Sequence, residues 1–287
     1  MTPNAKGALL MMGSMAAFTL NDTCVKATHG ALPLLQLLTL RGLISSLLIY
    51  LLARRLGALH LRMAPRDAAL LGVRCVSEVA AAYFFLTALM NMPLANVTAV
   101  LQVLPLTVTL GAALFFGESV GWRRMLAIAL GFGGMLLIVR PGPEGFSLHA
   151  LYALAAVGCV TVRDLVTRRM SAEVSSMTVT LASALAVFVA AGLASTWVEW
   201  VPLRLETASL IAASSFFVML GYLLSVLVMR VGEVSFIAPF RYTGLIWALG
   251  LGWAVFGHWP EPLTLLGAAI VAAAGLFTFY RGRVRAG

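Results

Sequence analysis

Residues 94–116 read LANVTAVLQVLPLTVTLGAALFF, and this stretch decides the fold of the chain. It contains no charged residue, and its amide side chains are limited to Asn96 and Gln102. A helix needs about 20 predominantly apolar residues to cross the hydrocarbon core of a bilayer. The stretch therefore predicts one membrane-spanning helix, and we look for similar stretches on both sides of it.

The composition of the whole chain also favours a membrane protein. Of the 287 residues, 61% are hydrophobic and 11% charged, and the mean hydropathy is +0.96. Soluble domains carry about 45–50% apolar and about 25% charged residues, which argues against an aqueous globular enzyme. The hydropathy pattern predicts an all-α polytopic membrane protein with ten transmembrane helices. We place them near residues 5–28, 33–53, 66–90, 94–116, 121–139, 147–168, 174–197, 208–229, 234–256 and 262–280.

The basic residues indicate the orientation of these helices. The chain has 20 Lys and Arg against 11 Asp and Glu, a formal net charge of +9. With the N-terminus inside, thirteen basic residues fall on the inner side, and only Lys26, Arg140 and Arg204 on the outer side. Cytoplasmic loops are enriched in Lys and Arg. We therefore expect both termini in the cytoplasm, with the chain in the inner (plasma) membrane, and we read the net charge as a topology signal rather than a nucleic-acid-binding surface.

The second half of the chain matches the first in a constant order, at a shift of about 140 residues. The matches are Asn21-Asp22 with Arg163-Asp164, Tyr83 with Tyr222, Met90 with Met229, Gln102 with Arg241, Pro105 with Gly244, Phe116-Gly117-Glu118 with Phe256-Gly257-His258, and Gly134 with Gly275. Five helices per half is an odd number, so the second half enters the membrane upside down. The sequence thus predicts two inverted five-helix repeats, residues 1–140 and 141–287, an arrangement typical of alternating-access carriers.

The same positions make the chain similar to a known family. It resembles the drug/metabolite transporter superfamily, in its ten-helix EamA-type branch, and within that branch the exporters of aromatic and neutral amino acids. The resemblance covers essentially the whole chain. It implies a 5+5 basket of helices around a central cavity, with the fifth and tenth helices packed behind. The residues that carry it are 18–26 (FTLNDTCVK), Tyr83 through Asn96 leading to Leu104-Pro105, Gly117-Glu118, 131–134 (GFGG), 238–242 (APFRY) and Gly257-His258.

Seven ionisable side chains fall inside the predicted spans: Asp22, Arg41, Arg74, Glu78, Arg163, Asp164 and Arg241. Each costs about 2.5–3.5 kcal/mol when it faces lipid at mid-depth, so we expect all of them to face the bundle interior, a partner or water. Arg74 and Glu78 are four residues apart and are expected to pair along their helix. Arg163 and Asp164 are adjacent and point about 100° apart, so we expect them to serve different neighbours. Arg41 is expected near an interface or paired with Asp22.

Four arginines against three acids leave one cation without an acidic partner, and a substrate carboxylate is one way to supply it. We favour Arg241, because its repeat mate Gln102 is also polar. The alternative is an arginine bonded to Asp22 or Glu78 and to backbone carbonyls. Tyr83 and Tyr222 either offer rings and hydroxyls to a solute or only pack between helices. The candidate substrate-binding residues are Asp22, Glu78, Tyr83, Gln102, Arg163, Asp164, Tyr222 and Arg241.

Prolines and glycines mark places where the helices bend or approach closely. Pro105, Pro239 and Gly244 are candidate hinges beside Gln102 and Arg241, since a proline removes a helical hydrogen bond. A static kink that improves packing is the alternative. Small residues also recur in the fifth and tenth helices, where we expect packing between the halves rather than between two chains, and hence a monomer. They are Ala127, Gly131, Gly134, Gly267 and Gly275.

These observations predict a secondary transporter, an exporter or facilitative carrier, of amino acids or related metabolites, working by alternating access around a central cavity. The alternative is a proton-coupled exporter of another metabolite or drug-like solute, with a passive channel or an intramembrane enzyme further behind. No GxxxxGK[ST] loop for ATP occurs, and the cysteines and histidines show no metal-ligand spacing. We expect no catalytic residues, no cofactor and no metal. The expected partners are a small, carboxylate-bearing substrate and the bilayer, with no nucleic acid.

Overall fold

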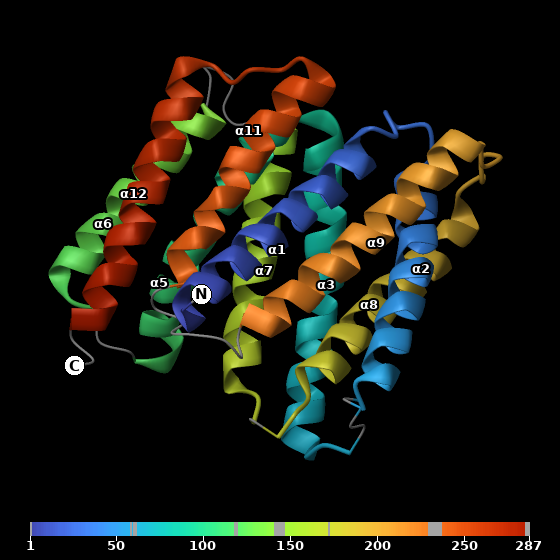
Figure 1. The fold of residues 1–287 in the computed structure, drawn as a ribbon, viewed down its shortest axis with the longest axis horizontal. Coiled ribbons are helices and arrows are strands. Elements are labelled where there is room, and N and C mark those ends of the chain that lie inside the picture. The colour runs from blue at the N-terminus through green and yellow to red at the C-terminus, as the bar shows by residue number, and fades with distance from the viewer. Residues whose placement is uncertain are drawn as a thin grey trace.

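The computed structural model describes residues 2–57, 59, 62–117, 120–140, 147–171, 173–228 and 237–284, and this part of the chain is built from helices connected by turns (Figure 1). In chain order the elements are α1 (Pro3–Lys26), α2 (Leu34–Arg55), α3 (Pro65–Asn91), α4 (Leu94–Leu101), α5 (Leu104–Phe116), α6 (Trp122–Val139), α7 (Leu148–Arg169), α8 (Ser176–Ala194), η1 (Ser195–Trp197), α9 (Leu205–Val228), η2 (Ala238–Tyr242), α11 (Thr243–Phe256) and α12 (Pro262–Val284).

Seven of the described helices are long and apolar enough to cross a membrane. They correspond to α1, α2, α3, α4 with α5 as one span, α7, α8 with η1, and α9. Two shorter apolar stretches follow the same pattern, Met125–Val139 within α6 and Pro262–Thr278 within α12. These elements are all-helical and polytopic, as the sequence predicts.

The single helix expected over residues 94–116 is broken. It divides into α4 and α5 around Gln102 and Val103, where the backbone N–H groups bond three residues back rather than only four. The cause is Pro105, which lies in the first turn of α5: proline has no N–H to donate, and its ring clashes with the carbonyl four residues earlier. The span expected over 234–256 begins outside the described residues, and its described part is the 3₁₀ turn η2 followed by α11.

The helix ends follow local sequence rules. Thr2 and Ser147 cap α1 and α7, because their side-chain oxygens accept the N–H of the residue three positions later. Gly117 and Gly257 end α5 and α11 in the left-handed conformation, with φ of 68° and 67°. Only glycine adopts that conformation without strain. The two glycines are also matched positions of the two halves.

Each of the principal helix pairs joins one helix from residues 1–140 to one from residues 141–287. α3 packs along α7, α1 along α9, α2 along α8, and α6 along α12 (Figure 1). In the α6–α12 contact the two backbones approach closely: a Cβ built on Gly134 would lie 2.8 Å from the carbonyl oxygen of Gly267, and one built on Gly267 would lie 2.5 Å from that of Gly134. The small residues of these helices therefore bring two backbones of the same chain together.

Candidate functional site

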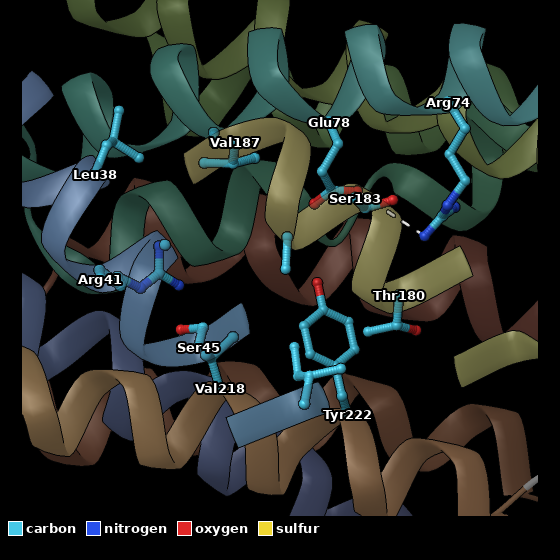
Figure 2. Close-up of a pocket in the computed structure, with 14 residues that line it drawn as sticks. Leu38, Arg41, Ser45, Arg74, Glu78, Thr180, Ser183, Val187, Val218 and Tyr222 are labelled. Carbon is cyan, nitrogen blue, oxygen red and sulfur yellow. Dashed lines mark ion pairs between the residues drawn. The ribbon is translucent and has the colours of Figure 1, made fainter. Parts of the chain in front are cut away.

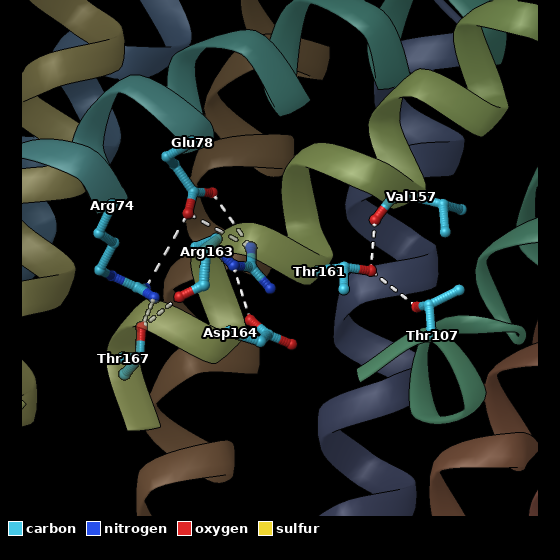
Figure 3. A network of polar contacts seen from close by, with 8 residues as sticks. All are labelled: Arg74, Glu78, Thr107, Val157, Thr161, Arg163, Asp164 and Thr167. Atoms are coloured by element: carbon cyan, nitrogen blue, oxygen red, sulfur yellow. Dashed lines mark hydrogen bonds and ion pairs between the residues drawn. The ribbon is translucent and has the colours of Figure 1, made fainter. Parts of the chain in front are cut away.

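A charge network joins α3 to α7 inside the bundle (Figure 3). Nη1 of Arg163 lies 3.3 Å from a carboxylate oxygen of Glu78, and Nη2 of Arg74 lies 3.9 Å from the same oxygen. Arg74 also donates a 2.5 Å hydrogen bond to the hydroxyl of Thr167. The side chains of Arg74 and Glu78 are only 11% and 14% exposed. Since Asp164 joins through Arg163, the network holds two cations and two anions.

One expectation about this network is wrong. Arg163 and Asp164 were expected to serve different neighbours, yet Nε of Arg163 donates a 2.9 Å hydrogen bond to Asp164. Their Cβ atoms do leave the helix in different directions, but the long, flexible arginine stem bends back to the adjacent carboxylate. Its planar guanidinium then has a second edge available for Glu78. A single arginine therefore bridges two acids.

A cavity of about 80 Å³ lies beside this network, between α2, α3, α8 and α9. Figure 2 shows Arg41, Glu78 and Tyr222 projecting from three different helices toward the same space. Ser45, Thr180 and Ser183 add hydroxyls to its wall, and the remaining wall is apolar. The cavity has room for a few waters, but ligand pockets have about 300–1,000 Å³. A larger solute therefore requires these helices to move apart.

Arg41 is the cation of this cavity that lacks a partner in the described part of the chain. Its Nε is buried and makes no hydrogen bond, and the hydroxyl of Ser45, one turn further along α2, is also unbonded. The positive charge interacts over a longer range with Asp22 and Glu78. A desolvated guanidinium without a hydrogen-bonded anion is costly, and carboxylates fit its donors best.

Asp22 lies on α1 in a small polar cluster. Its carboxylate accepts a 2.8 Å hydrogen bond from the side-chain amide of Asn21. The side-chain oxygen Oδ1 of Asn21 in turn accepts a 2.9 Å hydrogen bond from the hydroxyl of Ser214 of α9. Within the described residues no arginine lies within ion-pair distance of Asp22. The charges of Arg41 and Asp22 thus attract one another without forming an ion pair. Each side chain can therefore bind another partner.

The other predicted residues lie apart from this cavity. Tyr83 is 41% exposed, and its ring packs against those of Phe84 and Tyr152. Arg241 is exposed on η2 and does not line the cavity. The amide of Gln102 lies against Gly244, 3.5 Å from the position where a Cβ would be. Pro105 and Pro239 lie in the first turns of α5 and η2, next to these breaks.

Sequence reasoning missed the part of the cavity formed by α2 and α8. Arg41 was assigned to an interface or to Asp22, and Ser45, Thr180 and Ser183 were not singled out. A signal was present, because Arg41 and Ser45 are four residues apart and share one face of an otherwise apolar helix. Isolated hydroxyls on apolar helices are common, however, because they bond their own backbone. Within the described residues, no group of three or more His, Cys, Asp or Glu side chains is placed to hold a metal.

Comparison with known proteins supports the family resemblance. Residues 5–140 match the model of the EamA-like transporter family. The chain is 28% identical over 279 residues to the pseudopaline exporter CntI of Pseudomonas aeruginosa, covering 93% of this chain and 94% of that one. It is 27% identical to an S-adenosylmethionine uptake transporter of Rickettsia bellii, covering 66% of this chain and 64% of that one. A riboflavin transporter of Rhizobium johnstonii is 28% identical, with coverage of 65% and 62%.

A solved structure has the same fold. It superposes with a TM-score of 0.67 over 98% of this chain and 99% of the other, at 17% sequence identity. Every named relative above transports a small molecule, and none of those names denotes an enzyme. The chain is thus a multi-pass membrane protein that transports small solutes, and its first half, residues 5–140, is similar to the EamA-like transporter family.

Proposed function

We propose that the chain is a secondary carrier that exports, or equilibrates, a carboxylate-bearing small solute, an amino acid or a related metabolite. The observation that carries this proposal is the buried Nε of Arg41, which has no hydrogen bond in the described residues and belongs to a side chain that lines the cavity between α2, α3, α8 and α9. Arg74 and Arg163 are already bonded to Glu78 and Asp164. Arg41 therefore supplies the free positive charge for a solute carboxylate, and Ser45 supplies an adjacent hydroxyl.

The surrounding candidates form the polar frame of this site. Glu78 lines the cavity from α3 and is bonded to Arg163 of α7, which also bonds Asp164. Tyr222 presents its hydroxyl to the cavity from α9. Asp22 balances Arg41 from α1 when no solute is bound. A solute ammonium group would find its anion in Asp22 or Glu78, so both ends of a zwitterion have a counter-charge.

Alternating access is supported by the proposed structural equivalence of the two halves of the chain. Ten spans arranged as inverted repeats, residues 1–140 and 141–287, pair α1 with α7 and α3 with α9 as equivalent helices. Exchanging the halves then turns the α1–α9 contact into the α7–α3 contact, and leaves the α2–α8 and α6–α12 contacts unchanged. The left-handed ends at Gly117 and Gly257 correspond in the same way. Such a repeat supports rocking of one half against the other, with both termini at the cytoplasmic face of the inner membrane.

The breaks in two helices supply hinges for this motion. α4 ends at the Gln102 break, and the described part of the second span begins with the 3₁₀ turn η2, which contains Arg241 and runs into α11. The amide of Gln102 and Gly244 lie in contact, which places the two breaks side by side. Pro105, Pro239 and Gly244 are the positions where the backbone bends with the fewest hydrogen bonds to lose.

Proton coupling is the second candidate mechanism, and Asp22 is the observation that favours it. Its carboxylate accepts the Asn21 amide and lies within the membrane-spanning α1, without an ion pair in the described residues. Carboxylates in such places serve as proton relays in transporters. The solute of a proton-coupled exporter need not be an amino acid, since the relatives carry three different kinds of solute.

The test is reconstitution of the purified protein into liposomes, with concentration-dependent uptake and counterflow of an amino-acid panel, with and without a pH gradient. We expect saturable counterflow that Arg41→Gln reduces at least about tenfold, because a charged hydrogen bond contributes about 1.5–3 kcal/mol. Arg241→Gln is measured beside it, because the sequence favours that residue through its polar repeat mate Gln102. A loss with Arg241→Gln and normal transport with Arg41→Gln would refute the assignment. Uptake that does not saturate would indicate a channel.

A further inference from the structure

A second pocket lies at the helix ends around the α11–α12 connection, at the top of Figure 1. Its volume is about 420 Å³, within the range of about 300–1,000 Å³ typical of ligand pockets. It is bounded by the start of α4, the end of α6, the N-cap of α7, the end of α11 and the start of α12. It shares no lining residue with the Arg41 cavity, so the two are separate.

Two side chains that line this pocket carry buried polar atoms without a partner in the described part of the chain. Arg140 leaves Nε and Nη2 unbonded, and Asn96 leaves its carbonyl oxygen unbonded. The remaining edge of Arg140 binds Glu261 through Nη1. The wall therefore offers two donors of a guanidinium and one acceptor, and unbonded buried groups of this kind call for a ligand or water.

Arg140 is also held in an unusual backbone conformation. It ends α6 in the left-handed region, with φ of 48°. That conformation is uncommon and strained for a residue with a Cβ, and such residues concentrate at functional sites. The nearby Glu261 side chain is 70% exposed, so it exchanges its arginine partner for water at little cost. The ion pair is thus easily opened by a competing anion.

The rest of the wall suits an anion with an apolar body. α4 begins at Leu94 without a side-chain cap, and its first residues line the pocket, so the positive end of the helix dipole lies at the pocket wall. The start of α12 contributes Thr264 beside Glu261. Phe256 and Trp259 add aromatic surface to the pocket lining.

We propose that this pocket is a second solute site, in which the carboxylate of the solute replaces Glu261 on Arg140. A donor of the solute, an ammonium or hydroxyl group, satisfies Asn96, and its apolar part packs on Phe256 and Trp259. The inference rests on the proposed function and deepens it. With both termini cytoplasmic, the pocket opens on the outer face, where an exporter releases its solute.

The test counts binding sites by equilibrium dialysis of the purified full chain in detergent. The probes are radiolabelled L-phenylalanine, L-leucine, L-histidine and succinate, each measured separately. For at least one probe we expect two sites in the wild-type chain and one in Arg140→Gln, whose outer site is weakened at least about tenfold. Arg123→Gln, at the opposite end of the same helix, is the matched control and keeps both sites. Glu261→Gln removes the competing carboxylate and tightens the outer site roughly two- to fivefold.

The outcomes separate this inference from the proposed function. A single site that Arg140→Gln abolishes, with no transport in liposomes, would support the pocket and overturn the carrier proposal. Saturable transport with binding that Arg140→Gln leaves unchanged would overturn the pocket alone. Absence of binding by all four probes also overturns it. Should Arg140→Gln not fold by size exclusion and thermal unfolding, Asn96→Ala replaces it, and unchanged affinity in that variant counts against the pocket.

Discussion

Replacing Glu78 by glutamine removes the carboxylate that holds Arg74 and Arg163 together. The substitution keeps the volume and shape of the side chain, so the packing of α3 against α7 is preserved. It leaves two guanidiniums facing one another with Asp164 as their remaining acid, which is a net charge of one inside the bundle. Because the three side chains are between 11% and 21% exposed, little water is available to compensate.

Removing one partner of a buried ion pair costs about 3–5 kcal/mol. Since these side chains are not fully buried, we expect the lower end, about 3 kcal/mol. For large domains 1 kcal/mol corresponds to a shift of about 2–4 °C in Tm, which gives a decrease of about 6–12 °C. The assay is thermal unfolding in detergent, followed by tryptophan fluorescence and checked by size exclusion.

Two further variants isolate the charge effect. Glu261→Gln makes the same change in an ion pair whose acid is 70% exposed, and it is expected to cost at most about 1 kcal/mol. Combining Glu78→Gln with Arg163→Met restores the balance of Arg74 with Asp164, so the double variant is expected to be more stable than Glu78→Gln alone. Equal shifts for the two glutamine variants, or no recovery in the double variant, would show that the network is not held by charge.

Two other substitutions and one control variant test the contacts between helices by the same unfolding assay. Gly134→Ala forces a Cβ against the Gly267 carbonyl and is expected to cost about 1–3 kcal/mol. Its neighbour Gly133 has open space around it, so Gly133→Ala is expected to stabilise the helix by about 0.5–1 kcal/mol. A larger loss of stability in Gly133→Ala than in Gly134→Ala would contradict the packing. Lys26 of α1 donates hydrogen bonds of 2.9 and 2.7 Å to the backbone carbonyls of Leu89 and Met92. Lys26→Met is therefore expected to lower the free energy of unfolding by about 1.5–3 kcal/mol. An unchanged Tm would contradict this role of Lys26.

The helical fold was predictable because the bilayer imposes one dominant constraint. Apolar runs of about 20 residues have few alternatives to a spanning helix, so the positions of α1 to α3 and of α7 to α9 follow from hydropathy alone. The break at Gln102 was only half predictable. Pro105 indicates a bend, but hydropathy averages over the short gap between α4 and α5 and joins them into one span.

The candidate site was less predictable, because partners on different helices cannot be paired from sequence. Counting charges predicts a surplus cation but does not say which arginine it is. The pairing depends on α3 lying beside α7, which brings Arg163 within reach of Glu78, while Nε of Arg41 has no hydrogen bond in the described residues. Helix geometry also misjudged Arg163 and Asp164, since it describes Cβ directions and not the reach of a long side chain.

The α3–α7 network has a consequence for the order in which the protein is made. Glu78 and Arg163 are 85 residues apart, so α3 leaves the ribosome well before its partner exists. At about 5–20 residues per second the delay is on the order of 4–17 s. During this interval Arg74 and Glu78, one turn apart, neutralise one another and allow α3 to enter the lipid as a nearly uncharged segment. The arrival of α7 then adds Arg163 to this local pair, so assembly of the two halves gives Glu78 a second cationic partner.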